Sequence, residues 1–476
     1  MSMRSVKNKN QTILFIVKLL LLAAVTLIYG IIWFIYYANQ VNHPFYYYGN
    51  FVVIFIFMLL YANFSKLYGV FELRLSRTSD LVYSNVVSLL VTSFSMYCIT
   101  ILLERRLPNI LPLFLFMFVA FIISIPWAVL ANRLTNRVIL VRRILMVYDN
   151  EDARRNGEYI LTHIPWRYSL LDQIKIKDDI NETIAEINSF KSNGIMLCGL
   201  HSTPRNTILK YCIQNDIPVY LRPNIGDFIV KSAEEIQLAN LPVMLCQRSV
   251  VPTTYRIGKR IMDIALAILG LVVFSPFIVI TAIAIKLYDH GPVFYKQVRL
   301  TKDGKKFNVY KFRSMRVDAE KDGVARLASK GDNRITPIGK IIRAVRIDEI
   351  PQIFCILKGD MSIVGPRPER PKIAMDYEKE MPEFDLRLQV KAGLTGYAQV
   401  YGKYNTEPYD KLQMDLMYIA NQSFVTDLKI ILATIKILFL PESTEGVAAG
   451  QTTAMDYENA ADSTEKWEKR DEHWAD

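Results

Sequence analysis

The run IALAILGLVVFSPFIVITAIAIKL, residues Ile264–Leu287, is long enough to cross a bilayer but is interrupted at its centre by Ser275-Pro276. A spanning helix needs about 20 apolar residues. Proline inside a helix removes a hydrogen bond and clashes with the preceding turn, so we predict a kink here. Cations flank both ends, with Lys259 and Arg260 before the run and Lys286 in its last turn. Two interpretations stay open: a kinked spanning helix, or a broken helix that enters the bilayer and returns to the same face.

Four more apolar runs precede this one, and all lie within the first 130 residues: Leu19–Ala38, Tyr47–Phe64, Leu81–Leu103 and Ile110–Leu130. Basic residues gather before the first run, after the second and after the fourth, whereas the loop after the first contains no Lys or Arg. Because cytoplasmic loops carry an excess of Lys and Arg, we predict a four-helix transmembrane bundle over residues 1–140 with both ends in the cytoplasm. Arg105 and Arg106 oppose this orientation but are outnumbered.

Composition agrees with a membrane protein. The 476 residues are 51% hydrophobic and carry a formal net charge of +11. That balance favours cytoplasmic loops, anionic lipid or an acidic substrate. Nucleic acid is not expected as a partner, because no basic helix or aromatic-and-basic repeat is present. The five cysteines lack metal-ligand spacing and are interpreted as reduced thiols, and the five histidines show no zinc-binding pattern.

A different pattern occupies residues 141–250. Short β-rich runs at Ile144–Tyr148, Ile195–Cys198 and Val219–Leu221 alternate with helical patterns at Glu182–Phe190 and Arg205–Asn215. Such alternation predicts an α/β domain with a parallel sheet. The turn after the first strand lacks the glycines that let a backbone approach a pyrophosphate and has three acidic residues instead, so we predict no dinucleotide site.

Residues 251–440 are predicted to form a third, mixed α/β domain rich in basic residues and turns. Its last segment, Val425–Leu440, combines apolar patches with two lysines, which suits a helix at the membrane interface or packed on the core. The tail, residues 441–476, is acidic and rich in Ala, Ser and Thr, and we expect it to be disordered.

Within the third domain, Asp348 and Glu349 are adjacent carboxylates in an arginine-rich stretch, Arg343–Gln352. Such a pair is by itself most often a solvated surface cluster. Two neighbouring segments favour chemistry: Lys311–Arg316 upstream, and Gly359–Glu369 downstream, where glycines and prolines fix the turns. Carboxylates can hold Mg²⁺, guanidinium groups bind phosphate oxygens, and a carboxylate can attack phosphorus to form an acyl phosphate.

Six motifs in order over some 185 residues resemble the bacterial sugar transferase family, the monotopic phosphoglycosyl transferases that act on polyprenyl phosphate. The motifs are Ser275-Pro276, Gly291–Phe294, Tyr310–Met315, Asp348–Gln352, Lys358–Pro368 and Gly393–Val400. The bundle and the α/β domain in front resemble the family's long form, in which the α/β domain is a degenerate Rossmann-like fold. The resemblance thus implies four transmembrane helices, that domain, and a catalytic domain with a re-entrant membrane helix over residues 264–287, broken at Ser275 and Pro276.

The resemblance also implies roles for individual residues. Asp348 corresponds to the nucleophile, and to a ligand of Mg²⁺, and Glu349 to its dyad partner. Cations are implied around the substrate phosphates, and we predict that set to be Lys311, Arg313, Arg343, Arg367 and Lys403. Lys403 marks a departure, because the family often has Asn-Gly-Arg where this chain has Tyr-Gly-Lys, and lysine lacks the bidentate fork of arginine.

The resemblance implies an enzyme that transfers a hexose 1-phosphate from a UDP-sugar to undecaprenyl phosphate, releasing UMP, through a covalent phosphosugar–Asp348 intermediate. This would be the first membrane step of exopolysaccharide, capsule or O-antigen synthesis, at the bacterial inner membrane with the catalytic domain in the cytoplasm. The sequence does not identify the sugar, although glucose or galactose is favoured, and leaves homodimerisation open. The alternatives are a glycosyltransferase that passes a bare sugar to a lipid, and a catalytically silent membrane assembly protein.

Overall fold

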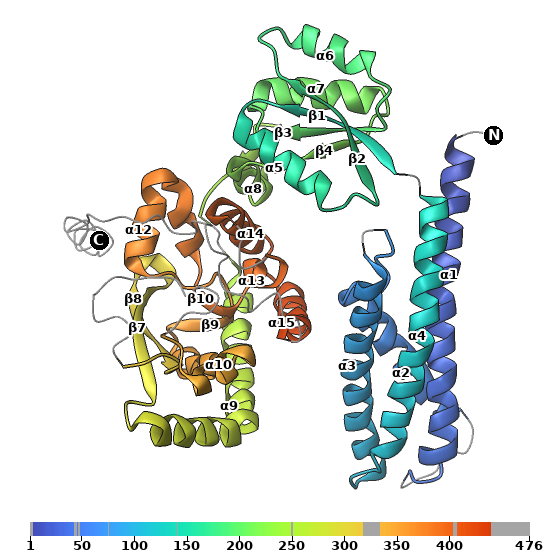
Figure 1. Cartoon of the computed structure of the whole chain (residues 1–476), viewed down its shortest axis with the longest axis vertical. Coiled ribbons are helices and arrows are strands. Elements are labelled where there is room, and N and C mark those ends of the chain that lie inside the picture. The colour runs from blue at the N-terminus through green and yellow to red at the C-terminus, as the bar shows by residue number, and fades with distance from the viewer. Residues whose placement is uncertain are drawn as a thin grey trace. The chain divides into compact units, whose positions relative to one another are not determined.

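The computed structural model describes residues 3–41, 45, 48–74, 76–139, 141–248, 251–317, 334–402 and 407–438. The chain forms two compact units, Met1–Pro223 and Asn224–Asp476 (Figure 1). Helix α8 (Ile225–Lys231) buries Ile225 and Phe228 in the core that the second unit builds around helix α14 (Pro408–Ala420). The division into three domains stays a prediction, and the predicted tail lies outside the described residues.

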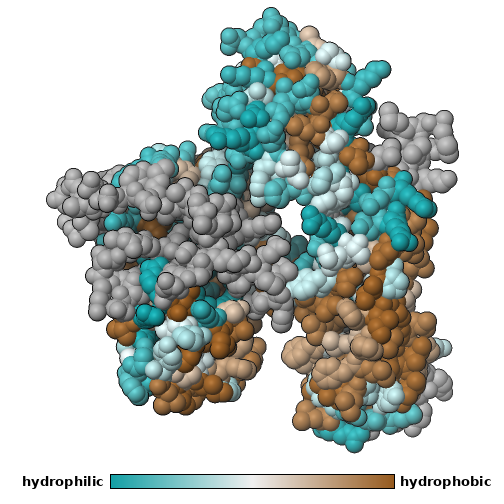
Figure 2. All heavy atoms as spheres, viewed as in Figure 1, coloured by the Kyte–Doolittle hydropathy of each residue, from teal (hydrophilic) through white to brown (hydrophobic). Residues whose placement is uncertain are grey.

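The first unit begins with four long helices: α1 (Met3–Ile32), α2 (Gly49–Leu67), α3 (Thr78–Glu104) and α4 (Leu111–Val138). One π-helical turn, η1 (Trp33–Tyr37), extends α1. By length and composition, all four can cross a membrane, over 26, 19, 27 and 28 residues. Hydrophobic atoms cover the middle of this bundle, and hydrophilic ones lie at its ends (Figure 2). The predicted set of four apolar N-terminal helices is confirmed.

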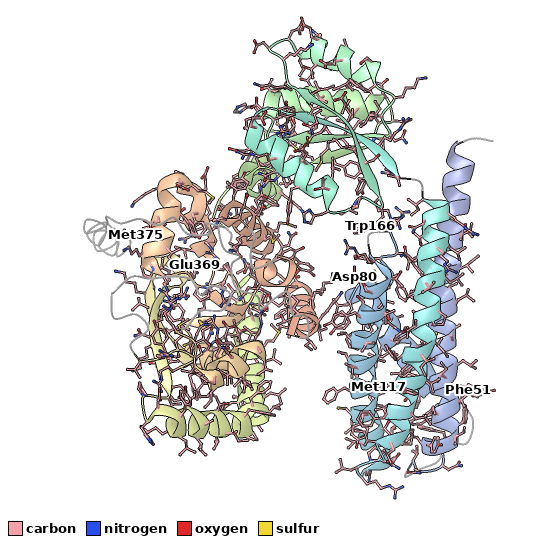
Figure 3. All side chains as sticks on the ribbon, in the orientation of Figure 1. Phe51, Asp80, Met117, Trp166, Glu369 and Met375 are labelled. Carbon is pink, nitrogen blue, oxygen red and sulfur yellow. The ribbon has the colours of Figure 1, made fainter. Side chains whose placement is uncertain are left out.

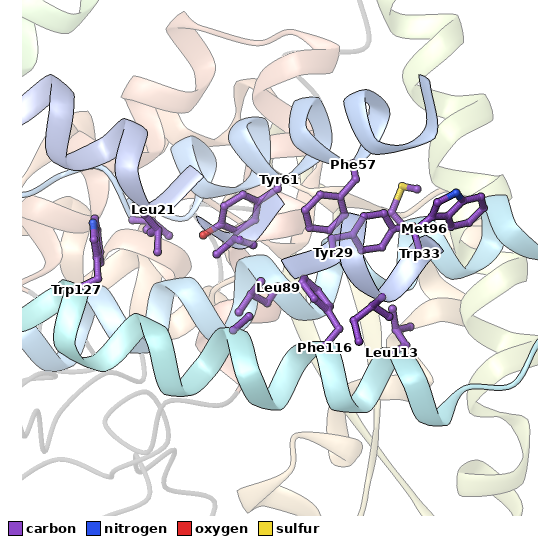
Figure 4. Packing of buried hydrophobic residues seen from close by; sticks show 14 of the residues in the cluster. Leu21, Tyr29, Trp33, Phe57, Tyr61, Leu89, Met96, Leu113, Phe116 and Trp127 are labelled. Carbon is purple, nitrogen blue, oxygen red and sulfur yellow. The ribbon is translucent and has the colours of Figure 1, made fainter. Parts of the chain in front are cut away.

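Aromatic stacking holds the bundle together. The rings of Tyr29 and Phe57 lie 3.9 Å apart and nearly parallel, and Phe116 meets Tyr29 edge-on at 5.5 Å, so that α1, α2 and α4 share one contact (Figure 4). Burial of such rings contributes apolar area and about 0.5–1.5 kcal/mol more per well-oriented pair. By contrast, Phe51 on α2 points away from the bundle and is 60% exposed (Figure 3). Apolar side chains on both faces are typical of helices surrounded by lipid.

The same unit contains a four-stranded parallel sheet in the order β2-β1-β3-β4. Its strands are β1 (Arg142–Tyr148), β2 (Tyr168–Lys175), β3 (Gly194–Cys198) and β4 (Val219–Leu221), and its helices are α5 (Glu151–Thr162), α6 (Ile180–Ser189) and α7 (Ser202–Gln214). The predicted alternation and parallel sheet are confirmed, although β2 was not predicted, because its mixed exposure hides a strand pattern. The finer assignment, a degenerate Rossmann-like domain, stays a prediction.

Helix α9 (Thr253–Asp289) contains the interrupted apolar run and has Pro276 inside it. The ribbon bends, so that its two halves run in different directions (Figure 1). Both halves pack on the second unit: Ala267 joins the core around Ile356, and Ile285 joins Phe312 and Ile342. Most other apolar side chains of α9 are exposed. The predicted kink is confirmed, whereas the re-entrant course in a membrane stays a prediction.

The rest of the second unit consists of shorter elements. Two antiparallel hairpins, β5 (Glu234–Leu238) with β6 (Leu241–Leu245) and β7 (Phe294–Leu300) with β8 (Lys306–Phe312), lie on either side of α9 in sequence. One parallel pair joins β9 (Met361–Val364) to β10 (Ala392–Thr395). The remaining elements are the 3₁₀ turns η2 (Lys302–Gly304), η3 (Ile347–Gln352) and η4 (Pro382–Gln389), and the helices α10 (Pro337–Ala344), α11 (Ile353–Lys358), α12 (Pro371–Glu380), α13 (Tyr397–Tyr401) and α15 (Phe424–Leu438).

Candidate active site

The two adjacent carboxylates lie on η3, a 3₁₀ turn between α10 and α11. The turn begins after Arg346, which adopts a left-handed backbone with φ of 55°. Such a conformation is strained for a residue with a side chain, and strain of this kind is found mostly at functional sites. Pro351 and Gln352 are buried, so the far end of the turn is anchored in the core. The segment therefore holds Asp348 and Glu349 in a fixed place.

Glu349 is neutralised by two cations from separate parts of the chain. Its Oε1 accepts from Lys311 Nζ at 2.9 Å and from Arg367 Nη2 at 2.8 Å. Burial would raise the pKa of Glu349, but the charges and hydrogen bonds of Arg367 and Lys311 hold that pKa well below its ordinary value. Glu349 is therefore an anion whose oxygen is already occupied.

Asp348 has the opposite environment. In the described part of the chain it forms no ion pair, although Lys311, Arg343 and Arg367 act on its charge. Burial raises the pKa of Asp348, and the neighbouring Glu349 adds to that rise. A carboxylate without a fixed partner keeps its oxygens available for a substrate or a metal ion. The structure thus separates two neighbouring residues that the sequence presents as equivalent acids.

Arg346 joins this cluster, although the sequence did not single it out as a site residue. Its side chain is partly buried, and burial lowers the pKa of Arg346 against the attraction of Glu349. The signal that could have found it is its place between the predicted cation Arg343 and the dyad. Lys311 reaches the same centre from β8, and burial lowers the pKa of its amine while Glu349 opposes that fall.

The loop that carries Arg367 is held by ion pairs of Glu369 and by a hydrogen bond to its backbone. Glu369 lies 3.7 Å from both Arg299 and Arg387, and Arg387 donates to the carbonyl of Arg367 at 2.9 Å. Arg387 also pairs with Asp415 of α14 at 2.7 Å. Burial raises the pKa of Asp415 to about 6. These four positioning residues were missed, although Asp415 within the buried face of α14 is a signal of a buried ion pair.

Glycine is required where this loop meets β10. A Cβ on Gly393 would lie 2.1 Å from the backbone nitrogen of Gly365, and a Cβ on Gly365 would lie 2.3 Å from the carbonyl oxygen of Lys391. Real Cβ atoms do not approach so closely, so the two backbones can touch only without side chains. The glycines of two predicted motifs thus serve one contact, which places Arg367 directly after the Gly365-Pro366 turn.

Three of the predicted phosphate-binding residues, Lys311, Arg343 and Arg367, gather around the dyad. Arg313 lies elsewhere: it is buried and pairs with Asp289 at the end of α9. Its assignment to substrate phosphate stays a prediction. Lys403 lies outside the described residues. Ser275 lies beside Pro276 in α9 and donates to the carbonyl of Val272 at 2.8 Å, which satisfies its hydroxyl within the helix.

The carboxylates of the candidate site show whether it could hold a magnesium ion. Among the described residues there is no cluster of three or more His, Cys, Asp or Glu side chains that could hold a metal ion. Mg²⁺ is commonly bound through one or two carboxylates together with substrate phosphates and water. Asp348 fits that requirement, because it forms no ion pair in the described part of the chain, whereas Oε1 of Glu349 already accepts from Lys311 and Arg367.

The match to a known protein family lies within the second unit. A model of the family described as bacterial sugar transferase matches residues 254–441. A putative undecaprenyl-phosphate N-acetylgalactosaminyl 1-phosphate transferase of Bacillus subtilis is 52% identical over 130 residues, which are 27% of this chain and 72% of that protein. The family match at residues 254–441 includes every described residue of the candidate site.

Two longer relatives match about half of this chain. The UDP-N-acetylgalactosamine-undecaprenyl-phosphate N-acetylgalactosaminephosphotransferase of Aeromonas hydrophila is 38% identical over 239 residues, 48% of this chain and 54% of its own. The UDP-glucose:undecaprenyl-phosphate glucose-1-phosphate transferase of Klebsiella pneumoniae is 36% identical over 226 residues, 46% of this chain and 48% of its own. The chain thus spans about half the length of these relatives.

Proposed function

Because this chain belongs to the bacterial sugar transferase family, we propose that it transfers a sugar 1-phosphate from a UDP-sugar to undecaprenyl phosphate. The products are undecaprenyl-diphosphate-sugar and UMP. The names of its relatives support the proposal, since they include undecaprenyl phosphate. These relatives use different sugars, N-acetylgalactosamine and glucose, so the sugar is left open.

The observation that carries the proposal is the unequal environment of the two carboxylates. Glu349 is held by Lys311 and Arg367, whereas Asp348 has no ion pair in the described chain. In the first step, an Asp348 oxygen attacks the sugar-bearing phosphorus, and the bond from that phosphorus to the bridging oxygen breaks. UMP leaves with that oxygen, and the phosphosugar remains on Asp348 as an acyl phosphate.

In the second step, an oxygen of the polyprenyl phosphate attacks the same phosphorus, and the bond to Asp348 breaks. Arg343, Lys311 and Arg367 face Asp348 and stabilise negative charge on the transferring group in both steps. Glu349 acts as a positioning residue, because its pKa is depressed and its oxygen orients Lys311 and Arg367. Magnesium, held by Asp348 and the substrate phosphates, would supply charge neutralisation of the diphosphate.

We further propose that α9 enters the membrane and returns to the face on which the catalytic unit lies. Support comes from its two ends: Lys259 pairs with Asp427 of α15 at 2.7 Å, and Asp289 pairs with Arg313. Both partners belong to the same folded unit, and a helix that crossed the bilayer once would leave its ends on opposite faces. We propose accordingly that the catalytic unit lies in the cytoplasm, which agrees with the positive-inside pattern of the sequence.

A labelling experiment tests the reaction. The protein in native membranes receives undecaprenyl phosphate and a panel of UDP-sugars labelled in the β-phosphate. Phosphate label in the lipid product together with free UMP supports the proposal. Label found only in released UDP would instead indicate a glycosyltransferase, and no turnover with any UDP-sugar would indicate a silent membrane protein.

A further inference from the structure

A pocket of about 550 Å³ lies at the end of the bundle where α1 begins. One wall is formed by Leu14, Phe15 and Lys18 of α1, and the other by Phe71–Arg74 of the loop between α2 and α3. This volume is in the range of ligand pockets, about 300–1,000 Å³. Leu14 and Lys18 lie one helical turn apart on the same face, so the pocket combines apolar side chains with a cation.

The loop wall is held in place from two sides. Val70 and Leu73 are buried in the bundle core, at 0% and 2% exposure. Outside the bundle, Arg167 donates to the carbonyls of Leu73 and Arg74, and Arg77 stacks 4.6 Å from the ring centre of Trp166. The backbone that presents Arg74 is therefore fixed on both faces, and the pocket is preformed.

The charged side chains that line this pocket do not pair with one another in the described part of the chain. In the described part of the chain, neither Lys18 nor Arg74 forms an ion pair, although Arg74 and Glu72 are both near enough to act on the charge of Lys18. Among the side chains that line the pocket, Lys18, Arg74 and Glu72 together carry a net charge of about +1. Lys18 lies near the start of the apolar span Thr12–Tyr37, where a lysine reaches toward the level of lipid headgroups.

We propose that this pocket binds one anionic bilayer lipid through a phosphodiester that carries a hydroxylated headgroup. Lys18 and Arg74 would contact phosphate oxygens, and the Glu72 carboxylate would accept from a headgroup hydroxyl. Leu14, Phe15 and Phe71 would pack on the first acyl carbons. Basic pockets between membrane helices on the cytoplasmic side are suited to such headgroups. A phosphodiester has one negative charge and matches the net charge of the pocket, whereas a phosphomonoester has nearly two at neutral pH.

The test measures lipid binding to the detergent-purified full-length protein by native mass spectrometry, with phosphatidylglycerol as the probe. The variant Lys18→Gln/Arg74→Gln is compared with Lys66→Gln/Arg133→Gln, which removes the same charge at the same end of the bundle but outside the pocket. One phosphatidylglycerol should bind the wild-type protein. Loss of each pocket cation should weaken binding about fivefold, or about 25-fold for both, whereas the control should stay within about twofold.

Three results would overturn the proposal: equal loss in the control, wild-type affinity in the pocket variant, or a larger loss of undecaprenyl phosphate or inorganic phosphate binding than of phosphatidylglycerol binding in the pocket variant. If the double variant does not fold, Arg74→Gln alone replaces it, because Arg74 is exposed and its side chain forms no ion pair in the described chain. Lys18→Arg/Arg74→Lys keeps both charges and should restore the affinity.

Discussion

Replacing each dyad carboxylate by its amide should give opposite effects on stability. Glu349→Gln removes the anion from two charge-assisted hydrogen bonds of 2.9 and 2.8 Å, each worth about 1.5–3 kcal/mol. The Arg367 side chain is 43% exposed, so its share is discounted for solvent screening, which leaves about 2–4 kcal/mol in total. For a unit of this size that loss lowers the unfolding temperature by roughly 5–10 °C. Asp348→Asn loses no ion pair and relieves the burial of a charge, so its unfolding temperature should stay level or rise.

Activity should follow the reverse order. Asp348→Asn removes the proposed nucleophile and should reduce turnover by at least about 10⁴-fold, the scale seen when a covalent catalytic residue is deleted. Glu349→Gln should also be severely impaired, through disordered cations rather than a lost nucleophile. Single-turnover measurement with UDP-sugar and no lipid acceptor separates the two. The wild-type enzyme should release UMP in a stoichiometric burst, Asp348→Asn should release none, and Glu349→Gln should keep a slowed burst.

Two results would refute this reasoning. A fall in the unfolding temperature of Asp348→Asn equal to that of Glu349→Gln would mean that both carboxylates are paired. Absence of acceptor-independent UMP and of a labelled protein adduct in the wild-type enzyme would exclude the covalent intermediate. In that event Asp348 would only bind metal, and the lipid phosphate would attack the UDP-sugar directly, while the overall reaction could still hold.

Other predictions follow from the same contacts. Gly393→Ala should force the Arg367 loop away from β10 and abolish activity, whereas Gly226→Ala, with open space around it, should leave activity unchanged; comparing the turnover of the two variants checks this. Because the pKa of Asp415 is raised to about 6, its ionisation weakens the folded state as pH rises from about 4 to 6; the unfolding temperature of Asp415→Asn minus that of wild type should grow over this window, and a flat difference would contradict it. Single cysteines at the exposed positions Ile257 and Tyr288 should react with a membrane-impermeant thiol reagent from the same side, and labelling from opposite sides would exclude a re-entrant α9.

Much of the fold could be predicted from the length of the apolar runs and from the alternation of β-rich and helical segments. The four bundle helices follow from runs of sufficient length, and three of the four sheet strands follow from short β-rich segments. Strand β2 was missed, because its residues Tyr168–Lys175 are mostly exposed or half-buried, and a strand of that kind shows little alternation. Packing of Ile225 and Phe228 against α14 could not be predicted, since it joins segments almost 200 residues apart that share no local pattern.

The candidate site was predictable as a set of residue types but not as a set of pairings. Lys311, Arg343 and Arg367 were predicted and gather around the dyad, because the motifs mark them. Arg313 belongs to the same motif as Lys311 but pairs with Asp289. Side chains alternate along a strand, so residues two apart share a face; however, the chain leaves β8 at Phe312, and regular alternation ends there. A motif therefore identifies cations without showing which of them reach the substrate.

The unequal roles of Asp348 and Glu349 arise from the 3₁₀ turn itself. Three residues complete one turn of such a helix, so neighbouring side chains project about 120° apart. Glu349 is thereby directed to Lys311 and Arg367, while Asp348 projects to another side and is left without an ion pair in the described chain. Two adjacent carboxylates would repel if both were ionised and unpaired. The two cations that contact Glu349 offset both that repulsion and the cost of burial at Glu349, but not at Asp348. The pKa of Glu349 is therefore lowered, whereas the pKa of Asp348 is raised. The proposed nucleophile needs free oxygens and the proposed positioning residue needs an oxygen that holds the cations, and consecutive positions of this turn meet both requirements.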